Sequence, residues 1–324
     1  DYLHAEGGYP NKEEVKQGST VDLFEMELNT YKKRGFAEKR IGVDVEWKPS
    51  QLKKIANILP KSTWAQIDDI CLQFRIVKTP EELALWQRAY DYFSKIHAFA
   101  RDYILQHGTD LTDYKIAKET EAYGVDLVMK DIKRDGRPHS AVGVEVGIGV
   151  RTGAATAYPH PNQFFHKRIE KGDALQVAGV VMIGGYGGEC YRYFQILPSD
   201  KWRDKVWQVV TDTIQIMVEE GVDGRTCSNL ANKVHQYQVK NGVAHLIYHR
   251  PGHGEGMEGH QAPWLALGDY TVLQEGMTFS VEPGLYDAKN SFGYNPSDTL
   301  LIGKDRGRLM SSVPMSKEWM YLKL

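Results

Sequence analysis

The chain has 324 residues, of which 42% are hydrophobic and 25% are charged, and its formal net charge is -2. These values suit a globular protein with one large core or two domains, and they argue against a basic nucleic-acid-binding or membrane-surface protein. The three cysteines, Cys71, Cys190 and Cys227, have no paired spacing, so we expect neither a disulfide framework nor a zinc knuckle. No apolar run reaches the roughly 18 residues that a membrane-spanning helix needs.

Residues 1–78 indicate part of a small α/β domain, and residues 79–324 are expected to form the main domain. Within the first part, RIGVDVEW at 40–47 is typical of a buried strand. SQLKKIANILP at 50–60 then predicts an amphipathic helix that ends at a proline. We therefore expect a strand–helix unit ahead of the main domain.

The main domain is expected to begin with a long helix. Thr79-Pro80-Glu81-Glu82 combines a capping residue, a proline in the first turn and acidic residues near the helix start, and an apolar stripe continues to about Gln106. A second helix is predicted over 111–130. The stretch at 140–161 alternates Val, Ile and Gly, which is typical of a strand approached closely on one face, and it leads to His160.

The sequence from 171 to 196 predicts a hairpin, with strands at about 174–183 and 190–196 and a Gly-rich turn at 184–188. Two helices are predicted next, over about 201–220 and 226–240. The remainder of the chain is expected to be rich in β-strands.

HRPGHGEGMEGH at 249–260 places His249, His253 and His260 within a dozen residues, with glycines between them. Glycine adds no packing surface, so this composition is poorly suited to a core. It favours close approach of imidazoles and backbone to a ligand. The alternative is a Gly/His loop held by backbone hydrogen bonds.

Five motifs follow one another along the chain: a Gly-rich strand ending in PH, a GD…GGYGGECYRYF hairpin, GHGEGMEGH, VEPGLY and GYNPSDT. Together they resemble the pita-bread fold family of methionine aminopeptidase, Xaa-Pro aminopeptidase, prolidase and creatinase. The resemblance implies an α+β fold in which two α-α-β-β halves form a curved antiparallel sheet with flanking helices. It also implies that 1–78 is a partial N-terminal domain of the creatinase or prolidase type, and that the protein is a homodimer.

The resemblance implies a degraded metal site. The family binds two metals through two Asp, one His and two Glu, and these positions fall on Ala178, Glu189, His253, Glu282 and Ser297. Alanine offers no ligand atom, and a serine hydroxyl is a poor substitute for a bridging carboxylate. We therefore expect no dinuclear site and no cofactor. One divalent metal held by Glu189, His253 and Glu282 is the alternative.

Creatinase, the family member that works without metal, suggests roles for the remaining residues. Its catalytic base falls on His160, so the expected catalytic residues are His160, His253, His260, Glu282 and Glu189. The expected substrate-binding residues are His249, Tyr186, Arg192 and Glu255. Two alternatives stay open: Arg192 forms a structural ion pair with Glu189 or Asp298, and Glu255 is a solvated loop charge.

Three functions are consistent with these residues. The first is a hydrolase or lyase that acts on a small molecule at a C–N or related bond, without the usual two metals and with His160 as general acid/base. The second is a metallopeptidase of the Xaa-Pro aminopeptidase or prolidase type with an unusual mononuclear site. The third is a non-catalytic binding module. We expect a small molecule or short peptide as substrate, no nucleic-acid or membrane partner, and a soluble protein with the cytoplasm as the favoured compartment.

Overall fold

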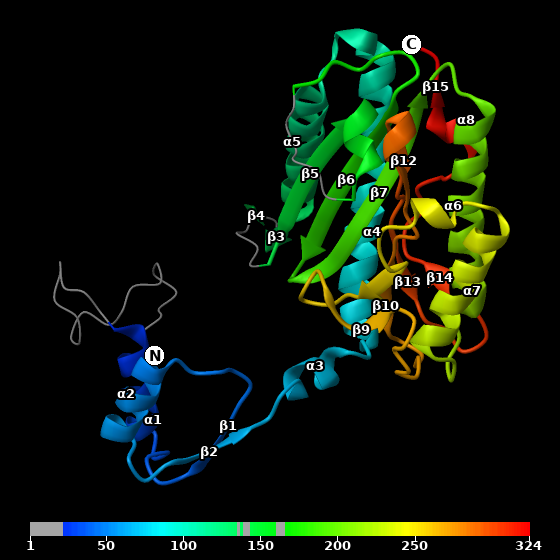
Figure 1. Cartoon of the computed structure of the whole chain (residues 1–324). Coiled ribbons are helices and arrows are strands. Elements are labelled where there is room, and N and C mark those ends of the chain that lie inside the picture. Colours follow the sequence, from blue (N-terminus) through cyan, green and yellow to red (C-terminus); the bar gives the residue numbers. More distant parts are fainter. Residues whose placement is uncertain (1–21, 135–136, 139–142, 160–165) are drawn as a thin grey trace. The chain divides into compact units, whose positions relative to one another are not determined.

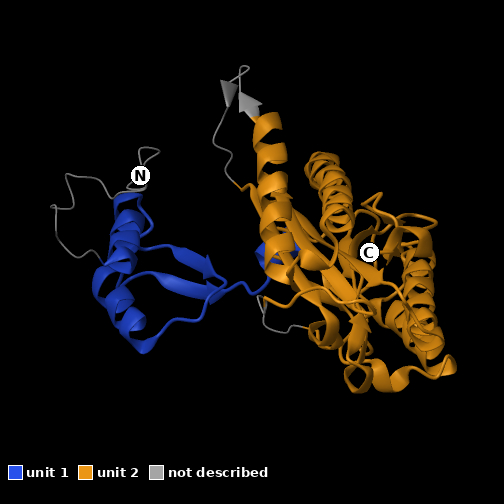
Figure 2. Cartoon of the chain, turned by 90° about the horizontal axis from the view of Figure 1, so that it is seen from above, with its two compact units in different colours: residues 1–74 blue, residues 75–324 orange. Residues whose placement is uncertain are grey.

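The computed structural model describes residues 22–134, 137–138, 143–159 and 166–324. The chain separates into two compact units, residues 1–74 and 75–324 (Figure 2). Within the described ranges, no helix is both long enough and apolar enough to cross a membrane.

The division lies close to the predicted domain boundary at residue 78 but comes before it. Ile76 is buried in a core cluster of the larger unit, and Val77 forms an antiparallel β-bridge with Met277. These contacts place the last residues of the predicted N-terminal segment in the larger unit.

The smaller unit contains α1 (Leu23–Lys33), β1 (Arg40–Val43), α2 (Pro49–Ile58) and β2 (Thr63–Gln66), and α3 (Ile70–Arg75) follows. β1 and β2 are parallel, and a small core forms around Leu28, Ile55 and Leu59. The helix predicted at 50–60 is confirmed. The buried strand predicted at 40–47 is wrong in length and burial: β1 ends at Val43 and its side chains are exposed or half-buried, because two strands alone cover little surface.

The larger unit opens with α4 (Pro80–His107), which confirms the predicted helix start. The Thr79 hydroxyl accepts a hydrogen bond from the Glu82 amide at 3.3 Å, and the Glu82 carboxylate accepts one from the Thr79 amide at 2.7 Å. α5 (Asp113–Asp131) confirms the second predicted helix. Both helices contact the strands of the first sheet (Figure 1).

The first sheet has the strand order β15-β7-β6-β5 (Figure 1). Its strands are β5 (Glu145–Thr152), β6 (Ala174–Ile183), β7 (Tyr186–Ile196) and the short β15 (Tyr321–Leu322). The predicted hairpin is confirmed, but its turn is shorter than expected. Gly184 and Gly185 have φ values of 63° and 82°, so these two residues reverse the chain and β7 begins at Tyr186.

One face of this sheet is apolar except near the seam described below, where it carries Arg192, and the other carries Arg151, Gln176 and Glu189. Ile148, Val177 and Cys190 point toward α4 and belong to the same core cluster as Tyr90 and Phe93 of that helix. Residues one position along each strand point to the opposite face. This opposite face, called the front face below, is where the site lies.

The second sheet has the order β14-β13-β10-β8-β9, with α6 (Lys201–Glu220) and α7 (Cys227–Lys240) beside it (Figure 1). Its strands are β8 (Gly252–Gly254), β9 (Gln261–Leu265), β10 (Thr278–Val281), β13 (Asp298–Leu301) and β14 (Arg308–Leu309). The two predicted helices are confirmed, with Thr226 as the cap of α7. The remaining short elements are η1 (Gly108–Asp110), β3 (Lys133–Arg134), β4 (Arg137–Pro138), η2 (Gly153–Ala157), η3 (Ala244–Leu246), β11 (Leu285–Asp287), η4 (Ala288–Asn290), β12 (Phe292–Tyr294) and α8 (Lys317–Met320).

The two sheets meet at a seam between β7 and β13. Tyr191 and Ser297 exchange backbone hydrogen bonds of 3.0 and 3.1 Å there. On the side of the seam away from the front face, Arg192 Nη2 donates to Asp298 Oδ2 at 2.6 Å, and both side chains are almost fully buried. The seam therefore joins the sheets and leaves the front-face residues of both sheets facing one another.

Candidate functional site

Glu189 of β7 projects from the front face beside the seam. Its carboxylate accepts a hydrogen bond from the Ser280 hydroxyl at 2.7 Å and another from the Tyr191 hydroxyl. Tyr191 follows Glu189 by two positions and therefore lies on the same face. These two donors hold the Glu189 carboxylate toward the second sheet.

His253 of β8 and Glu282, which directly follows β10, complete the cluster. Ser280 pairs with His253 in the sheet register, so their side chains share a face. His253 Nε2 lies 3.6 Å from Glu189 Oε1 and 3.4 Å from Glu282 Oε1. It is buried and has no hydrogen-bond partner among the described residues. Asn295 donates to the second oxygen of Glu282 at 3.4 Å.

The two carboxylates determine the charge on the imidazole. Burial opposes a charged ring, but Glu189 and Glu282 outweigh it and raise the pKa of His253 to about 10. Burial alone would raise the pKa of Glu189, but His253 and Tyr191 hold it below its usual value. Without a bound cation, the cluster is therefore an imidazolium between two carboxylates.

The three ligand atoms fit one metal ion. All lie within 4.8 Å of one another, in the one group of possible metal ligands found among the described residues. Ligands at about 2.1 Å from a tetrahedral zinc ion are roughly 3.4 Å apart, close to the two distances from His253 Nε2. A buried imidazole nitrogen without a partner is also the atom that a metal would engage. The donor set thus suits a single divalent ion.

Ala178 and Ser297 supply no carboxylate for a second metal ion. Ala178 lies on β6 opposite Tyr191 and contributes only a methyl group. Ser297 is fully buried, and its hydroxyl is 3.1 Å from that of Ser280. A hydroxyl–hydroxyl contact therefore stands where the resemblance places the last glutamate.

Glu255, predicted to bind substrate, is buried rather than solvated. Its carboxylate accepts hydrogen bonds from the Thr299 hydroxyl at 2.6 Å and the Glu189 amide at 3.4 Å. Burial, and then the charge of Glu189, raises its pKa to about 8. The solvated alternative is wrong, since the side chain is only 1% exposed.

Of the other predicted site residues, some join the cluster and some lie elsewhere. The His260 ring lies against that of His253, with centroids 4.1 Å apart and planes tilted by 31°, so it joins the cluster. Tyr186 donates to Glu82 at 2.6 Å, which ties β7 to the start of α4. Arg192 lies on the opposite side of the sheet, paired with Asp298, and this geometry favours its structural alternative. His160 lies outside the described residues.

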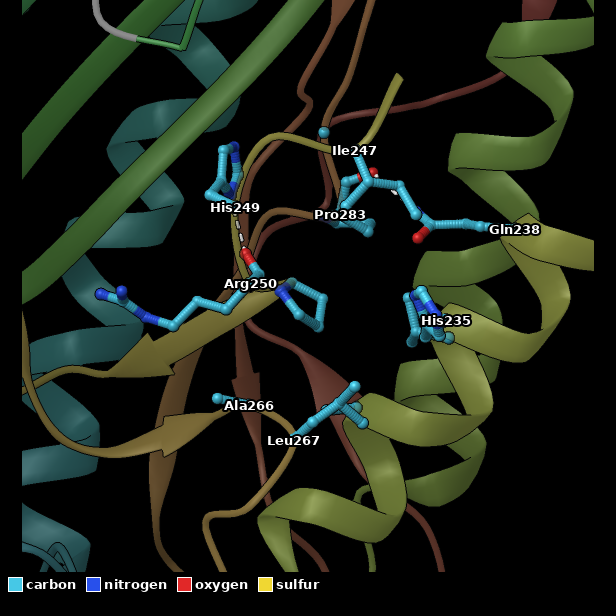
Figure 3. Close-up of a pocket in the computed structure, with 12 residues that line it drawn as sticks. His235, Gln238, Ile247, His249, Arg250, Ala266, Leu267 and Pro283 are labelled. Atoms are coloured by element: carbon cyan, nitrogen blue, oxygen red, sulfur yellow. Dashed lines mark hydrogen bonds between the residues drawn. The ribbon is translucent and has the colours of Figure 1, made fainter. Parts of the chain in front are cut away.

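His249 lies at a different place from the cluster. One ring nitrogen is 2.9 Å from the Tyr286 hydroxyl and the other 2.7 Å from the Arg250 carbonyl. It lines a cavity of about 270 Å³ between α7 and the loops next to His253 and Glu282 (Figure 3). His235 and Gln238 of α7 line the other side of this cavity. None of the three cluster residues lines it.

Sequence reasoning missed Tyr191 and Ser280 as partners of Glu189. Tyr191 was identifiable by its spacing of two from Glu189 on a strand. No local pattern could identify Ser280, because it lies 91 positions along the chain and meets Glu189 only across the seam.

The sequence is similar to a known family of proteins. A model of metallopeptidase family M24 matches residues 85–304. An Xaa-Pro dipeptidase of Pyrococcus horikoshii is 27% identical over 261 residues, covering 81% of this chain and 69% of that protein.

Solved structures share the fold. An X-Pro aminopeptidase from Thermotoga maritima has a TM-score of 0.78 at 20% identity, over 98% of this chain and 83% of that one. The N-terminal domain of the FACT complex subunit SPT16 from chickpea has a TM-score of 0.75 at 15% identity, over 94% and 76%. Identities this low show the fold alone. On the family match, the chain belongs to metallopeptidase family M24 and is a pita-bread hydrolase related to Xaa-Pro aminopeptidase and prolidase.

Proposed function

We propose that the chain hydrolyses a peptide bond in short peptides at the cluster of Glu189, His253 and Glu282, with one divalent metal ion instead of two. The observation that carries this proposal is the buried His253 Nε2, which has no hydrogen-bond partner among the described residues and lies within 3.6 Å of two carboxylate oxygens. Two carboxylates and an imidazole are costly to bury together unless a counter-charge or a metal ion compensates their charges.

The surrounding residues support this assignment. Tyr191 and Ser280 fix the Glu189 carboxylate, and Asn295 contacts Glu282, so the donor atoms are held in place before any ligand binds. A divalent ion bound there supplies Lewis acidity toward a carbonyl oxygen and makes water a stronger acid. His260 is exposed and its ring contacts that of His253, which suits contact with substrate.

The names of the relatives suggest the substrate. Several relatives are Xaa-Pro dipeptidases, so the bond that we propose is the one preceding proline in a dipeptide. This is a C–N bond of the kind expected from the sequence. The roles of His160 as acid/base and of a homodimer stay predictions.

Metal content and turnover test the proposal together. We expect one equivalent of zinc, manganese or a similar ion by calorimetric titration of the chelator-treated protein, and cleavage of Ala-Pro that chelation abolishes. His253→Ala and Glu282→Gln should each lose the metal. Glu258→Gln is the matched control, because this exposed carboxylate in the same loop pairs with Arg75 at 3.0 Å.

Three results would contradict the proposal in different ways. Binding of two equivalents of metal would show that the site is dinuclear. Cleavage that persists without metal would favour the metal-free route through His160. A protein that binds metal or peptide but cleaves none of a panel of dipeptides would be a binding module.

A further inference from the structure

The front face of the first sheet carries a cation whose charge no described acidic residue balances. Arg151 of β5 pairs with Gln176 of β6, which pairs with Tyr193 of β7, so the three side chains form one row on this face. Gly147, Val180 and Glu189 form another row of the same three strands. Arg151 therefore shares the face of Glu189.

The guanidinium of Arg151 is oriented but not neutralised. Nη1 donates to the Gln176 side-chain oxygen at 2.7 Å and to the Pro159 carbonyl at 3.5 Å. Within the part of the chain that the structure describes, Nε is buried without a partner and no ion pair joins Arg151 to a carboxylate. The six residues after Pro159 contain no Asp or Glu in the sequence. An arginine held by neutral groups keeps its positive charge, and its remaining N–H groups can donate two parallel hydrogen bonds to an anion.

The charge of Arg151 reaches the residues beside the cluster. Burial raises the pKa of the Tyr193 and Tyr286 hydroxyls, and the positive charge of Arg151 opposes that rise in both. Tyr193 is in the row of Arg151, and Tyr191, two positions before it on the same face of β7, donates to Glu189. The arginine therefore lies on the same side of the sheet as the hydroxyl that holds the candidate ligand.

The middle row, between Arg151 and Glu189, carries small residues on two of its three strands. It consists of Gly149, Ala178 and Tyr191. In the row of Glu189, a Cβ at Gly147 would meet no atom within 4 Å. Residues four positions apart on a strand are separated by about 13 Å. Two or three extended residues span roughly 7–10 Å, and the arginine side chain covers the rest.

We propose that Arg151 is a specificity-determining residue that binds the free carboxylate of the substrate, so that the site selects peptides ending within one or two residues of the cleaved bond. This inference rests on the proposed function and deepens it. The proposed cleavage site lies at one end of the front face and the guanidinium at the other, as the scissile bond and the terminal carboxylate of a short peptide require. No covalent step involves Arg151.

A pair of ligands that differ only in the carboxylate tests the inference. Calorimetric binding of L-proline and L-prolinamide is measured on the wild type and on Arg151→Met, Arg151→Lys and Arg168→Met. We expect the wild type to bind proline at least about tenfold more tightly than the amide. Arg151→Met should abolish the difference. Arg151→Lys should keep part of it, because it retains the charge but not the fork.

Arg168→Met is the matched control, since Arg168 is an exposed arginine of the same unit, and it should keep the full preference. An unchanged preference in Arg151→Met, or none in the wild type, overturns the inference. The ratio of kcat/KM for Ala-Pro and Ala-Pro amide distinguishes a failure of this inference from a failure of the proposed function. If the protein cleaves Ala-Pro but the ratio does not depend on Arg151, the proposed function is supported and the carboxylate subsite is refuted. If the binding preference for the carboxylate depends on Arg151 but the protein cleaves no peptide, the subsite is supported and the proposed function is refuted.

Discussion

Asp298→Asn is expected to destabilise the larger unit strongly, because it leaves the Arg192 guanidinium buried without a counter-charge. The two side chains are 0% and 1% exposed, and they are joined by a contact of 2.6 Å. Asp298 also accepts from the Ser311 amide at 3.1 Å. Removing one member of a buried pair costs roughly 3–5 kcal/mol. At about 2–4 °C per kcal/mol for a domain of this size, the Tm should fall by roughly 6–20 °C.

Differential scanning calorimetry measures this loss, with chelator present so that metal binding does not shift the Tm. Asp126→Asn is the control, because its pair with Lys130 is 3.9 Å long and both side chains are more than three-quarters exposed. An exposed pair contributes at most about 1 kcal/mol. If Asp298→Asn lowers the Tm no more than the control does, the seam pair does not hold the sheets together and the reasoning is refuted.

Two further predictions concern buried titratable groups. Burial, and then the charge of Arg192, lowers the pKa of His97 to about 3, whereas an unfolded histidine titrates near 6.5. The unfolded chain therefore binds an extra proton below pH 6.5, and stability should fall there by up to about 1.4 kcal/mol per pH unit. His97→Leu should flatten this slope in urea unfolding between pH 6.5 and 4, and an unchanged slope would contradict the assignment. Burial raises the pKa of Cys190 and Cys227 to about 12, so a thiol reagent at pH 8 should react rapidly with exposed Cys71 alone in the native protein; three rapidly reacting thiols would show that the cores open.

Local signals predicted the elements that local physics determines. The capping residue and proline at 79–80 gave the start of α4, and the Gly-rich hairpin gave β6 and β7. The strand expected at 40–47 ends early, because burial depends on which elements cover it and not on its own hydrophobicity.

The site was predictable in part. Glu189, His253 and Glu282 converge as the motifs implied, but the position of Arg192 depended on strand parity and on the seam. Arg192 differs from Glu189 by an odd number of positions, so on β7 it must point away from the cluster. That parity excludes Glu189 as its partner, whereas the choice of Asp298 needed the tertiary pairing of β7 with β13.

The charges of the cluster fit the metal count that we propose. By the resemblance to the pita-bread family, a site with four carboxylates and one neutral histidine balances two divalent ions. The same resemblance places Ala178 and Ser297 at two of the carboxylate positions, which leaves Glu189 and Glu282 to balance one ion. Without any metal, two buried carboxylates remain, and the single imidazolium of His253 compensates only one of them. Because an uncompensated buried charge is costly, this charge count supports the proposal of a site with one ion.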